Sequence, residues 1–547
     1  MDDARERARA QVGALMVCGY QEAGPPGEAF LERVRTGRMG GVILFARNTP
    51  SLASLAEIRR ALDEAAGQDL LVAIDEEGGW VSRLPAPWPR LPAAMALGSA
   101  ASQRPEAVRA YARRLGLGLR ALGINQDYAP VLDVNTAPDN PIIGSRAFGD
   151  DAEAVGRLGS AFAQGLEDAG VVATGKHFPG HGATRVDSHL DLPVLDFDLE
   201  RLTRLELLPF ARAAAAGMSA FMTAHVALPR VAEAPVLPAT VSRRVLTDIA
   251  RHKLGFDGLV VTDCMEMQGV ARAYGTARAS VMAVAAGADQ VLVSHTADLQ
   301  AATFEALERA VTDGEIPPER VFEAAGRVER LRRRVASLPP APPLAEALER
   351  LAQAADRLSG ESVYEAPGAD AKAHPAPDVW LVPGQGSARW RSVVAPAGAA
   401  VARALGAGPG ARTIAVDEGG TPEARPEPGQ RLALLVPSLR RFPGWLALWR
   451  GLAQHPRVAV LIQDPYDAAR LPDAERIVVA PTPSPAAVLR AVAVVLGEAR
   501  AEGLAPIDLR GVGEELAAAS FTALEEPLDA STPARLLPQS GEGTGGV

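Results

Sequence analysis

The stretch from residue 176 to residue 189 carries the densest set of side chains that could take part in chemistry. It reads Lys176-His-Phe-Pro-Gly-His-Gly and, a few residues on, Asp187-Ser-His189. Lys176 and His177 can donate hydrogen bonds to hydroxyl groups of a ligand. Because Asp187 and His189 are two residues apart, a tight turn lets the carboxylate hold and polarise the imidazole, which exchanges protons near neutral pH. The sequence predicts an acid/base pair here.

A carboxylate also stands at the end of the apolar run 259–263, which closes on Asp263 and continues Cys-Met-Glu266. A carboxylate in this place can attack an anomeric carbon and form a covalent glycosyl-enzyme. The plainer alternative is an aspartate that caps the next helix. Glu266 is a rival carboxylate, which we expect on that helix. The sequence therefore makes Asp263 a candidate nucleophile, with these alternatives open.

Two further segments offer groups for binding. In Asp75-Glu-Glu-Gly-Gly-Trp80-Val-Ser-Arg83, an acid at a strand end can bind vicinal hydroxyls, and the glycines permit close approach of the backbone. In the segment 139–149, Arg146 offers a fork of donors for a carboxylate or a carbonyl. Each segment alone is unspecific, since a surface arginine is usually just solvated.

Three histidines in the first stretch, at positions 177, 181 and 189, raise the question of a zinc site. Their spacing is not a recurrent zinc pattern, and loops of glycine and proline hold ligands poorly. We expect no metal and no cofactor. A purely structural role for the loop, as a conformational lock, stays open.

Eight short apolar runs, separated by helix-like segments, must position these groups within the first 335 residues. They are 15–19, 41–45, 70–75, 125–132, 171–176, 219–225, 258–263 and 290–295. Such alternation predicts βα units and a parallel sheet. Eight units fit a (β/α)8 barrel, and a doubly wound open sheet is the competing interpretation.

Polar residues gather where these runs end, and the carboxyl ends of barrel strands form the active-site face. They are Asp75, Glu76, Asp127, Lys176, His177, His225, Asp263 and His295. Any one of them could be a helix cap or a loop hydrogen bond. Taken together, they indicate an active site at the carboxyl ends of the barrel strands.

The remainder of the chain predicts a smaller α/β sandwich domain. The expected division is a barrel over 1–336, a proline-rich linker and helix over 337–359, an α/β domain over 360–525 and a disordered tail over 526–547. Expected strands are 379–382, 432–436, 458–462 and 476–479. This domain offers no obvious catalytic candidate, so we expect it to support the barrel or to form dimer contacts.

The composition limits the possible partners. The 547 residues carry a formal net charge of −10, which disfavours nucleic acid and anionic membranes. Cys18 and Cys264 suggest no disulfide framework. The charged N-terminus lacks the apolar core of a signal peptide, and no apolar stretch is long enough to span a bilayer. We expect a cytoplasmic monomer or homodimer.

Together, these segments resemble glycoside hydrolase family 3, and most closely its β-N-acetylglucosaminidase branch, which acts on cell-wall fragments. The matches are IDEEGGWVSRL, DYAPVLDVN, NPIIGSRAFG, KHFPGHG, DSH, MTAHV and VTDCMEM, in the expected order across roughly residues 10–335. KHFPGHG followed by DSH is the most specific. A fainter resemblance to the family's C-terminal domain covers 360–525.

The resemblance implies the roles of the site residues. Asp263 would be the nucleophile, and His189, tuned by Asp187, the proton donor and acceptor. The terminal sugar would be bound by Asp75, Arg83, Arg146, Lys176 and His177. The reaction would retain configuration, with a histidine in place of the usual second carboxylate.

Some positions depart from the family pattern. Trp80 stands where this branch often has arginine, and Glu76 where it often has glutamine. Cys264 follows the expected nucleophile, where β-glucosidases commonly have tryptophan, which favours the hexosaminidase branch. A neutral imidazole would repel an anionic acceptor less than a carboxylate does, so phosphorolysis stays open.

The expected protein is an exo-acting, retaining β-N-acetylhexosaminidase of cell-wall recycling, with a carbohydrate substrate. Alternatives are a β-glucosidase or a phosphorylase of the same fold, a non-catalytic sugar-binding protein and, less favoured, a metal hydrolase.

Overall fold

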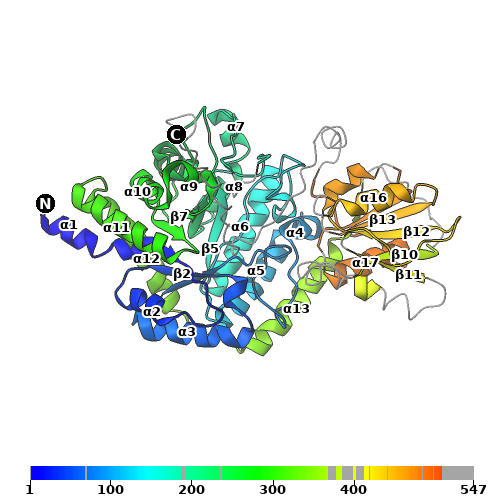
Figure 1. Cartoon of the computed structure of the whole chain (residues 1–547), viewed down its shortest axis with the longest axis horizontal. Coiled ribbons are helices and arrows are strands. Elements are labelled where there is room, and N and C mark those ends of the chain that lie inside the picture. Colours follow the sequence, from blue (N-terminus) through cyan, green and yellow to red (C-terminus); the bar gives the residue numbers. More distant parts are fainter. Residues whose placement is uncertain are drawn as a thin grey trace, which may run out of the picture.

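The computed structural model describes residues 2–67, 70–186, 191–232, 237–366, 377–384, 398–401, 412–417, 419–439, 442–462, 464–471, 473–482, 484–496 and 498–507. Two units lie side by side, and the long helix α13 (Leu344–Glu361) runs between them (Figure 1).

The first unit is a closed barrel of eight parallel strands. They are β1 (Met16–Cys18), β2 (Gly41–Leu44), β3 (Leu71–Ile74), β4 (Gln126–Asp127), β5 (Val172–Phe178), β6 (Ala220–Thr223), β7 (Leu259–Cys264) and β8 (Gln290–Val293). The register of β1 against β8, with Cys18 opposite Val293, closes the ring. Each strand overlaps one predicted apolar run, because barrel strands are buried on both faces. The predicted barrel is confirmed, and the open sheet is excluded.

Helices surround this barrel. They are α1 (Asp2–Arg9), α2 (Glu28–Arg35), α3 (Leu52–Ala66), α4 (Ala94–Ala101), α5 (Pro105–Ala121), α6 (Ala152–Ala169), α7 (Leu199–Arg204), α8 (Leu208–Ala215), a π-helix (Arg244–Lys253), α9 (Gln268–Tyr274), α10 (Thr276–Ala286), α11 (Ala297–Asp313) and α12 (Pro318–Ala336).

Local sequence sets the limits of these helices. In α6, the side chain of Asp151 accepts a hydrogen bond from the Glu153 amide at the start, and Gly170, at φ 85°, ends the helix. Helices α5 and α6 pack very closely, since a Cβ at Gly165 would lie 2.3 Å from the Arg109 carbonyl oxygen. These caps and close contacts hold the helices that frame the barrel.

The second unit is a six-stranded sheet with the order β11-β10-β12-β13-β14-β9. Its strands are β9 (Tyr364–Glu365), β10 (Val379–Pro383), β11 (Arg412–Val416), β12 (Leu432–Val436), β13 (Arg457–Ile462) and β14 (Arg476–Ala480), with helices α16 (Gly444–Gly451) and α17 (Pro485–Val495). The four predicted strands are confirmed. Strands β9 and β11 were not predicted, because β9 has two residues and β11 is partly exposed.

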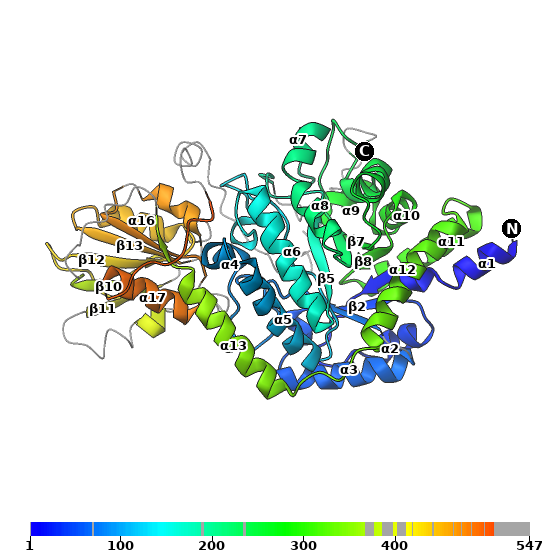
Figure 2. The same cartoon turned by 180° about the vertical axis from the view of Figure 1, so that it is seen from behind.

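Several contacts join the two units. Helix α13 packs against α4 and α5 of the barrel and against α17 of the second unit (Figure 2). The Ser99 hydroxyl donates to the Ser362 carbonyl at 2.7 Å, and the Asn135 side-chain amide donates to the Tyr466 hydroxyl at 2.7 Å. Trp80, from the loop after β3, packs against the apolar cluster of the second unit. The second sheet is therefore tied to the loops at the barrel mouth.

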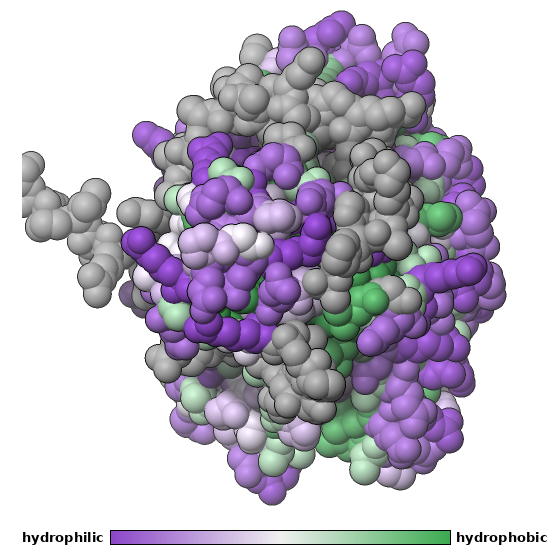
Figure 3. All heavy atoms as spheres, turned by 90° about the vertical axis from the view of Figure 1, so that its right-hand side faces the viewer, coloured by the Kyte–Doolittle hydropathy of each residue, from purple (hydrophilic) through white to green (hydrophobic). Residues whose placement is uncertain are grey.

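The end of the molecule that carries the second sheet presents hydrophilic side chains with a hydrophobic area beside them (Figure 3).

Among the described residues, no helix combines the length and the apolar character needed to cross a membrane. The domain limits given above stay a prediction, and residues 508–547 lie outside the described part of the chain.

Candidate active site

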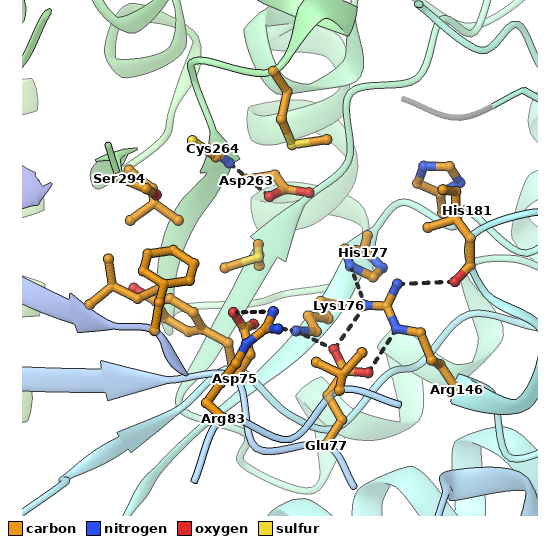
Figure 4. Close-up of a pocket in the computed structure, with 18 residues that line it drawn as sticks. Asp75, Glu77, Arg83, Arg146, Lys176, His177, His181, Asp263, Cys264 and Ser294 are labelled. Atoms are coloured by element: carbon orange, nitrogen blue, oxygen red, sulfur yellow. Dashed lines mark hydrogen bonds and ion pairs between the residues drawn. The ribbon is translucent and has the colours of Figure 1, made fainter. Parts of the chain in front are cut away.

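A cavity opens at the carboxyl ends of the barrel strands (Figure 4). Its charged or titratable lining groups include Asp75, Glu77, Arg83, Arg146, Lys176, His177, His181 and Asp263. Apolar side chains, including Ile43, Phe45, Met222, Met267 and Leu292, complete the wall. All the predicted binding residues and the predicted nucleophile meet in this cavity. Asp187 and His189 lie outside the described residues.

Lys176 is the positive charge at the centre of the residues that were predicted to bind the sugar, which we call the binding side of the cavity. It extends from β5, is buried, and places its Nζ 2.7 Å from Asp75 Oδ1 and 2.6 Å from Glu77 Oε1. Burial lowers the pKa of Lys176, but the two carboxylates outweigh burial and raise that pKa above its usual value. The lysine is therefore a fixed positive charge.

Arg146 forms the second ion pair with the same acid. Its Nε and Nη2 each donate to one oxygen of Glu77 at 2.8 Å, a bidentate pair. Burial raises the pKa of Glu77, but Arg146 and Lys176 outweigh burial and hold it well below its usual value. The sequence did not single out Glu77, because three acids in a row (75–77) give no sign of which ones face the cavity.

His177 is oriented by an acid that the sequence also missed. Asp133 Oδ2 lies 2.7 Å from His177 Nδ1, and Asp133 Oδ1 accepts from the backbone amides of His177 and His181 at 3.2 and 2.7 Å. Burial raises the pKa of Asp133, but its contacts with His177 hold that pKa below its usual value. An ionised Asp133 requires a proton on Nδ1, which leaves Nε2 facing Arg146 at 3.4 Å.

His181 lines the cavity as a neutral ring. Its Nδ1 lies 2.7 Å from the Thr184 hydroxyl, and burial, aided by His177, lowers its pKa to about 4. Nδ1 of His177 is already bonded to Asp133, and Nδ1 of His181 is already bonded to Thr184.

Among the described residues, possible metal ligands come close together at a different place. They are Cys264, Glu266 and His295.

Asp263 lies near the end of β7 and faces the cavity (Figure 4). Its Oδ1 accepts from the Cys264 amide at 2.7 Å. Burial raises the pKa of the Cys264 thiol to about 12, so this neighbour carries no negative charge at neutral pH. The buried His225 donates through Nε2 to the Cys264 carbonyl at 2.9 Å, which fixes the backbone beside Asp263.

The expectation that Glu266 lies on a helix was wrong. Glu266 occupies the turn between β7 and α9, and its carboxylate accepts from the amides of His295 and Thr296 at 2.7 and 3.0 Å. It ties the end of β7 to the segment after β8 and does not line the cavity.

Other polar residues at strand ends are structural. Asp127 is fully buried and accepts from the Glu76 amide at 3.0 Å. Glu76 in turn accepts from the Ser82 hydroxyl, the Arg83 amide and the Trp88 indole, and so shapes the loop after β3. Burial raises the pKa of Glu76 to about 7.

The comparisons with known proteins agree with this geometry. The sequence profile of the glycosyl hydrolase family 3 N-terminal domain matches residues 11–331. The chain therefore belongs to glycoside hydrolase family 3 and is a glycoside hydrolase.

Individual relatives are similar to this chain in sequence and in structure. A β-hexosaminidase of Thiobacillus denitrificans is 41% identical over 265 residues, which cover 48% of this chain and 73% of the relative. A family 3 β-N-acetylglucosaminidase from Paenibacillus sp. superposes with a TM-score of 0.81 at 32% identity, over 92% of this chain and 98% of that one. A β-N-acetylhexosaminidase from Beutenbergia cavernae gives 0.53 at 33% identity, over 60% and 98% of the two chains.

Proposed function

We propose that this glycoside hydrolase is a retaining exo-β-N-acetylhexosaminidase that removes terminal β-linked N-acetylglucosamine, with peptidoglycan-derived cell-wall fragments as its substrates. The observation that carries the proposal is a single cavity in which Asp263 faces a fixed set of charged binding groups. The names of the relatives support the specificity for the hexosamine. The location in the cytoplasm remains part of the same proposal.

The binding groups hold the terminal sugar. Asp75 accepts hydrogen bonds from hydroxyls, while Arg83, Arg146 and Lys176 donate to sugar oxygens. Asp75, Glu77 and Lys176 are already ion-paired, so these groups stand in place before the sugar enters. Such preorganisation reduces the loss of side-chain entropy on binding. His177 is held by Asp133 with Nε2 turned toward this group.

The reaction proceeds in two displacements at the anomeric carbon. Asp263 attacks the carbon as the glycosidic bond breaks, and His189 delivers a proton to the departing oxygen, assisted by Asp187. The product of this step is a covalent glycosyl-enzyme on Asp263. His189 then takes a proton from water, whose oxygen displaces Asp263, and the configuration is retained overall.

Release of p-nitrophenol from its β-N-acetylglucosaminide tests the proposal. The wild type should cleave this substrate, and Asp263→Ala should not. Cleavage of the β-glucoside instead would overturn the specificity. Binding of the glycoside without turnover by the wild type would support a sugar-binding protein.

Phosphorolysis is the second candidate for the same site, because the proposed histidine brings no negative charge near an incoming anion. Turnover in the presence of phosphate, with analysis for a glycosyl phosphate product, distinguishes the two reactions. A phosphate-independent rate with free N-acetylglucosamine as the product supports hydrolysis.

A further inference from the structure

Three side chains that can bind a metal ion come together next to the proposed nucleophile. The sulfur of Cys264, a carboxylate oxygen of Glu266 and a ring nitrogen of His295 all lie within 4.8 Å of one another. None of the three histidines whose spacing argued against zinc, at positions 177, 181 and 189, belongs to this set. The set is therefore a separate place in the fold, and neither the proposed catalysis nor the proposed sugar binding uses its side chains.

The barrel holds these three groups at neighbouring strand ends. Cys264 is the last residue of β7, Glu266 lies in the following turn, and His295 follows β8 by two residues. Strands β7 and β8 are paired in parallel with Cys264 opposite Leu292, so their carboxyl ends adjoin. The Glu266 carboxylate accepts from the His295 amide at 2.7 Å, which fixes the segment after β8 against the turn after β7. The side chains are thus positioned before an ion arrives.

The combination of sulfur, nitrogen and oxygen ligands selects a class of ion. Cysteine, histidine and carboxylate bind Zn²⁺ in tetrahedral sites, whereas Mg²⁺ and Ca²⁺ prefer oxygen ligands alone. The Cys264 thiol donates to Glu266 Oε2 at 3.9 Å. An ion would replace this thiol proton, which passes to water, and would bind the thiolate that remains. Because Cys264 also lines the sugar cavity, an ion can enter from there and keep a water molecule as its fourth ligand.

An ion at this place would act on the nucleophile through Cys264. The Cys264 amide donates to Asp263 Oδ1 at 2.7 Å, while the sulfur of the same residue is turned away from Asp263 (Figure 4). Ligand atoms around a tetrahedral Zn²⁺ lie roughly 3.5 Å apart, so binding draws the sulfur toward Glu266 and moves the end of β7. A misplacement of a reacting group by about 1 Å can cost on the order of 100-fold in rate. The positive charge also stabilises the Asp263 carboxylate and makes it less ready to attack.

We propose that Cys264, Glu266 and His295 form an inhibitory site for Zn²⁺ or a cation of the same class, which slows the attack of Asp263 on the substrate. The ion is a regulator and takes no part in the reaction itself. The inhibition rests on the proposed role of Asp263 as nucleophile, whereas the binding of the ion does not depend on that role.

Turnover with and without Zn²⁺ tests the inhibition. Zn²⁺ at micromolar concentrations should lower kcat of the wild type on the p-nitrophenyl substrate at least about tenfold, and a chelator should restore it. Mg²⁺ at the same concentration should have no effect. Cys264→Ala and His295→Ala should each raise the half-inhibitory concentration of Zn²⁺ at least about tenfold. Each variant is compared with itself, with and without the ion, so a change in its rate without Zn²⁺ does not enter the comparison.

Cys18→Ala is the matched control. Cys18 is the other cysteine of the chain, is also buried, and ends β1 on the far side of β8, but it does not belong to the set. Zn²⁺ should inhibit this variant as strongly as the wild type. Inhibition that keeps its full strength in Cys264→Ala would place the ion on other ligands, such as Asp187 and His189, and would overturn the proposal.

Co²⁺ as a spectroscopic probe separates failure of the metal site from failure of the proposed function. A Co²⁺–thiolate bond gives a charge-transfer band in the near ultraviolet, which requires no turnover. The band should appear in the wild type, in Cys18→Ala and in Asp263→Ala, and it should be absent from Cys264→Ala. A wild type without the band overturns the site, whatever the enzyme proves to cleave. A band that depends on Cys264 without any loss of turnover overturns the inhibition.

Discussion

The two sides of the barrel mouth are built differently. On the side of β3 and β5, Asp75, Glu77, Lys176 and Arg146 form a continuous set of ion pairs between buried or half-buried side chains. On the side of β7, Asp263 is held through the backbone amide of Cys264, whose own carbonyl is fixed by His225. The first arrangement fixes charges for recognition, while the second fixes the direction of one carboxylate.

This difference predicts that changes on the two sides affect different quantities. A change at β7 should act on the chemical step and leave the fold intact. A change among the ion pairs should act on affinity and on stability together, because removing one member leaves a buried charge uncompensated.

The largest effect is expected for Asp263→Ala. Removal of a covalent nucleophile should lower kcat on the p-nitrophenyl substrate on the order of 10⁴-fold or more, with little change in the melting temperature. Glu266→Gln is the matched control, since Glu266 lies three residues on and outside the cavity. Full activity in Asp263→Ala, or an equal loss in Glu266→Gln, would contradict the assignment at β7.

The next largest effect is expected for His189→Ala. Loss of a general acid and base should lower kcat by about 10²- to 10⁴-fold. The loss should be smaller for a glycoside whose leaving group has a low pKa, because such a group departs without a proton. The pH profile of kcat should also lose the limb that His189 contributes. A variant with equal losses on good and poor leaving groups would argue against proton donation by this residue.

Much of this arrangement could be predicted from the sequence. The strands are apolar on both faces and therefore stood out as runs, and Asp75, Lys176 and Asp263 stood at their ends. Glu77 and Asp133 were missed, because their importance comes from partners about 40 to 100 residues away. These pairings depend on tertiary contacts, which local patterns do not contain.

The same limit explains why two polar residues at strand ends, Asp127 and His225, were grouped with the candidate site residues although they do not line the cavity. Asp127 and His225 follow apolar runs just as Asp263 does, yet both are fully buried, and their hydrogen bonds include ones to neighbouring elements of the barrel. Position at a strand end predicted the level of a side chain along the barrel axis. It did not predict whether the side chain turns into the cavity or into the wall.

On the binding side, Lys176→Met should affect both stability and affinity. Asp75 and Glu77 would lose their shared cation, which should lower the free energy of unfolding by about 3 kcal/mol and raise KM. Arg109→Met is the control, because Arg109 forms its ion pair with Asp168 on the surface of the helices, where water weakens such a pair, so this variant should leave stability and KM nearly unchanged. Denaturant unfolding and KM measure the two effects. An unchanged KM would show that the ion pairs serve the fold alone.

The smallest effect is expected for Glu76→Gln, in the wall just behind the binding side. Burial raises the pKa of Glu76 to about 7 from 4.5, so the folded protein binds more protons than the unfolded chain between these values. This group therefore makes the free energy of unfolding fall as pH rises from about 4.5 to 7. Glutamine keeps an acceptor for Ser82 or Trp88 and has no charge to bury. Denaturant curves at pH 5 and pH 8 should show a pH dependence smaller than that of the wild type by on the order of 1 kcal/mol. An identical pH dependence would place the titration elsewhere, and Asp127, which is equally buried and bonded to the same loop, would be the next residue to replace.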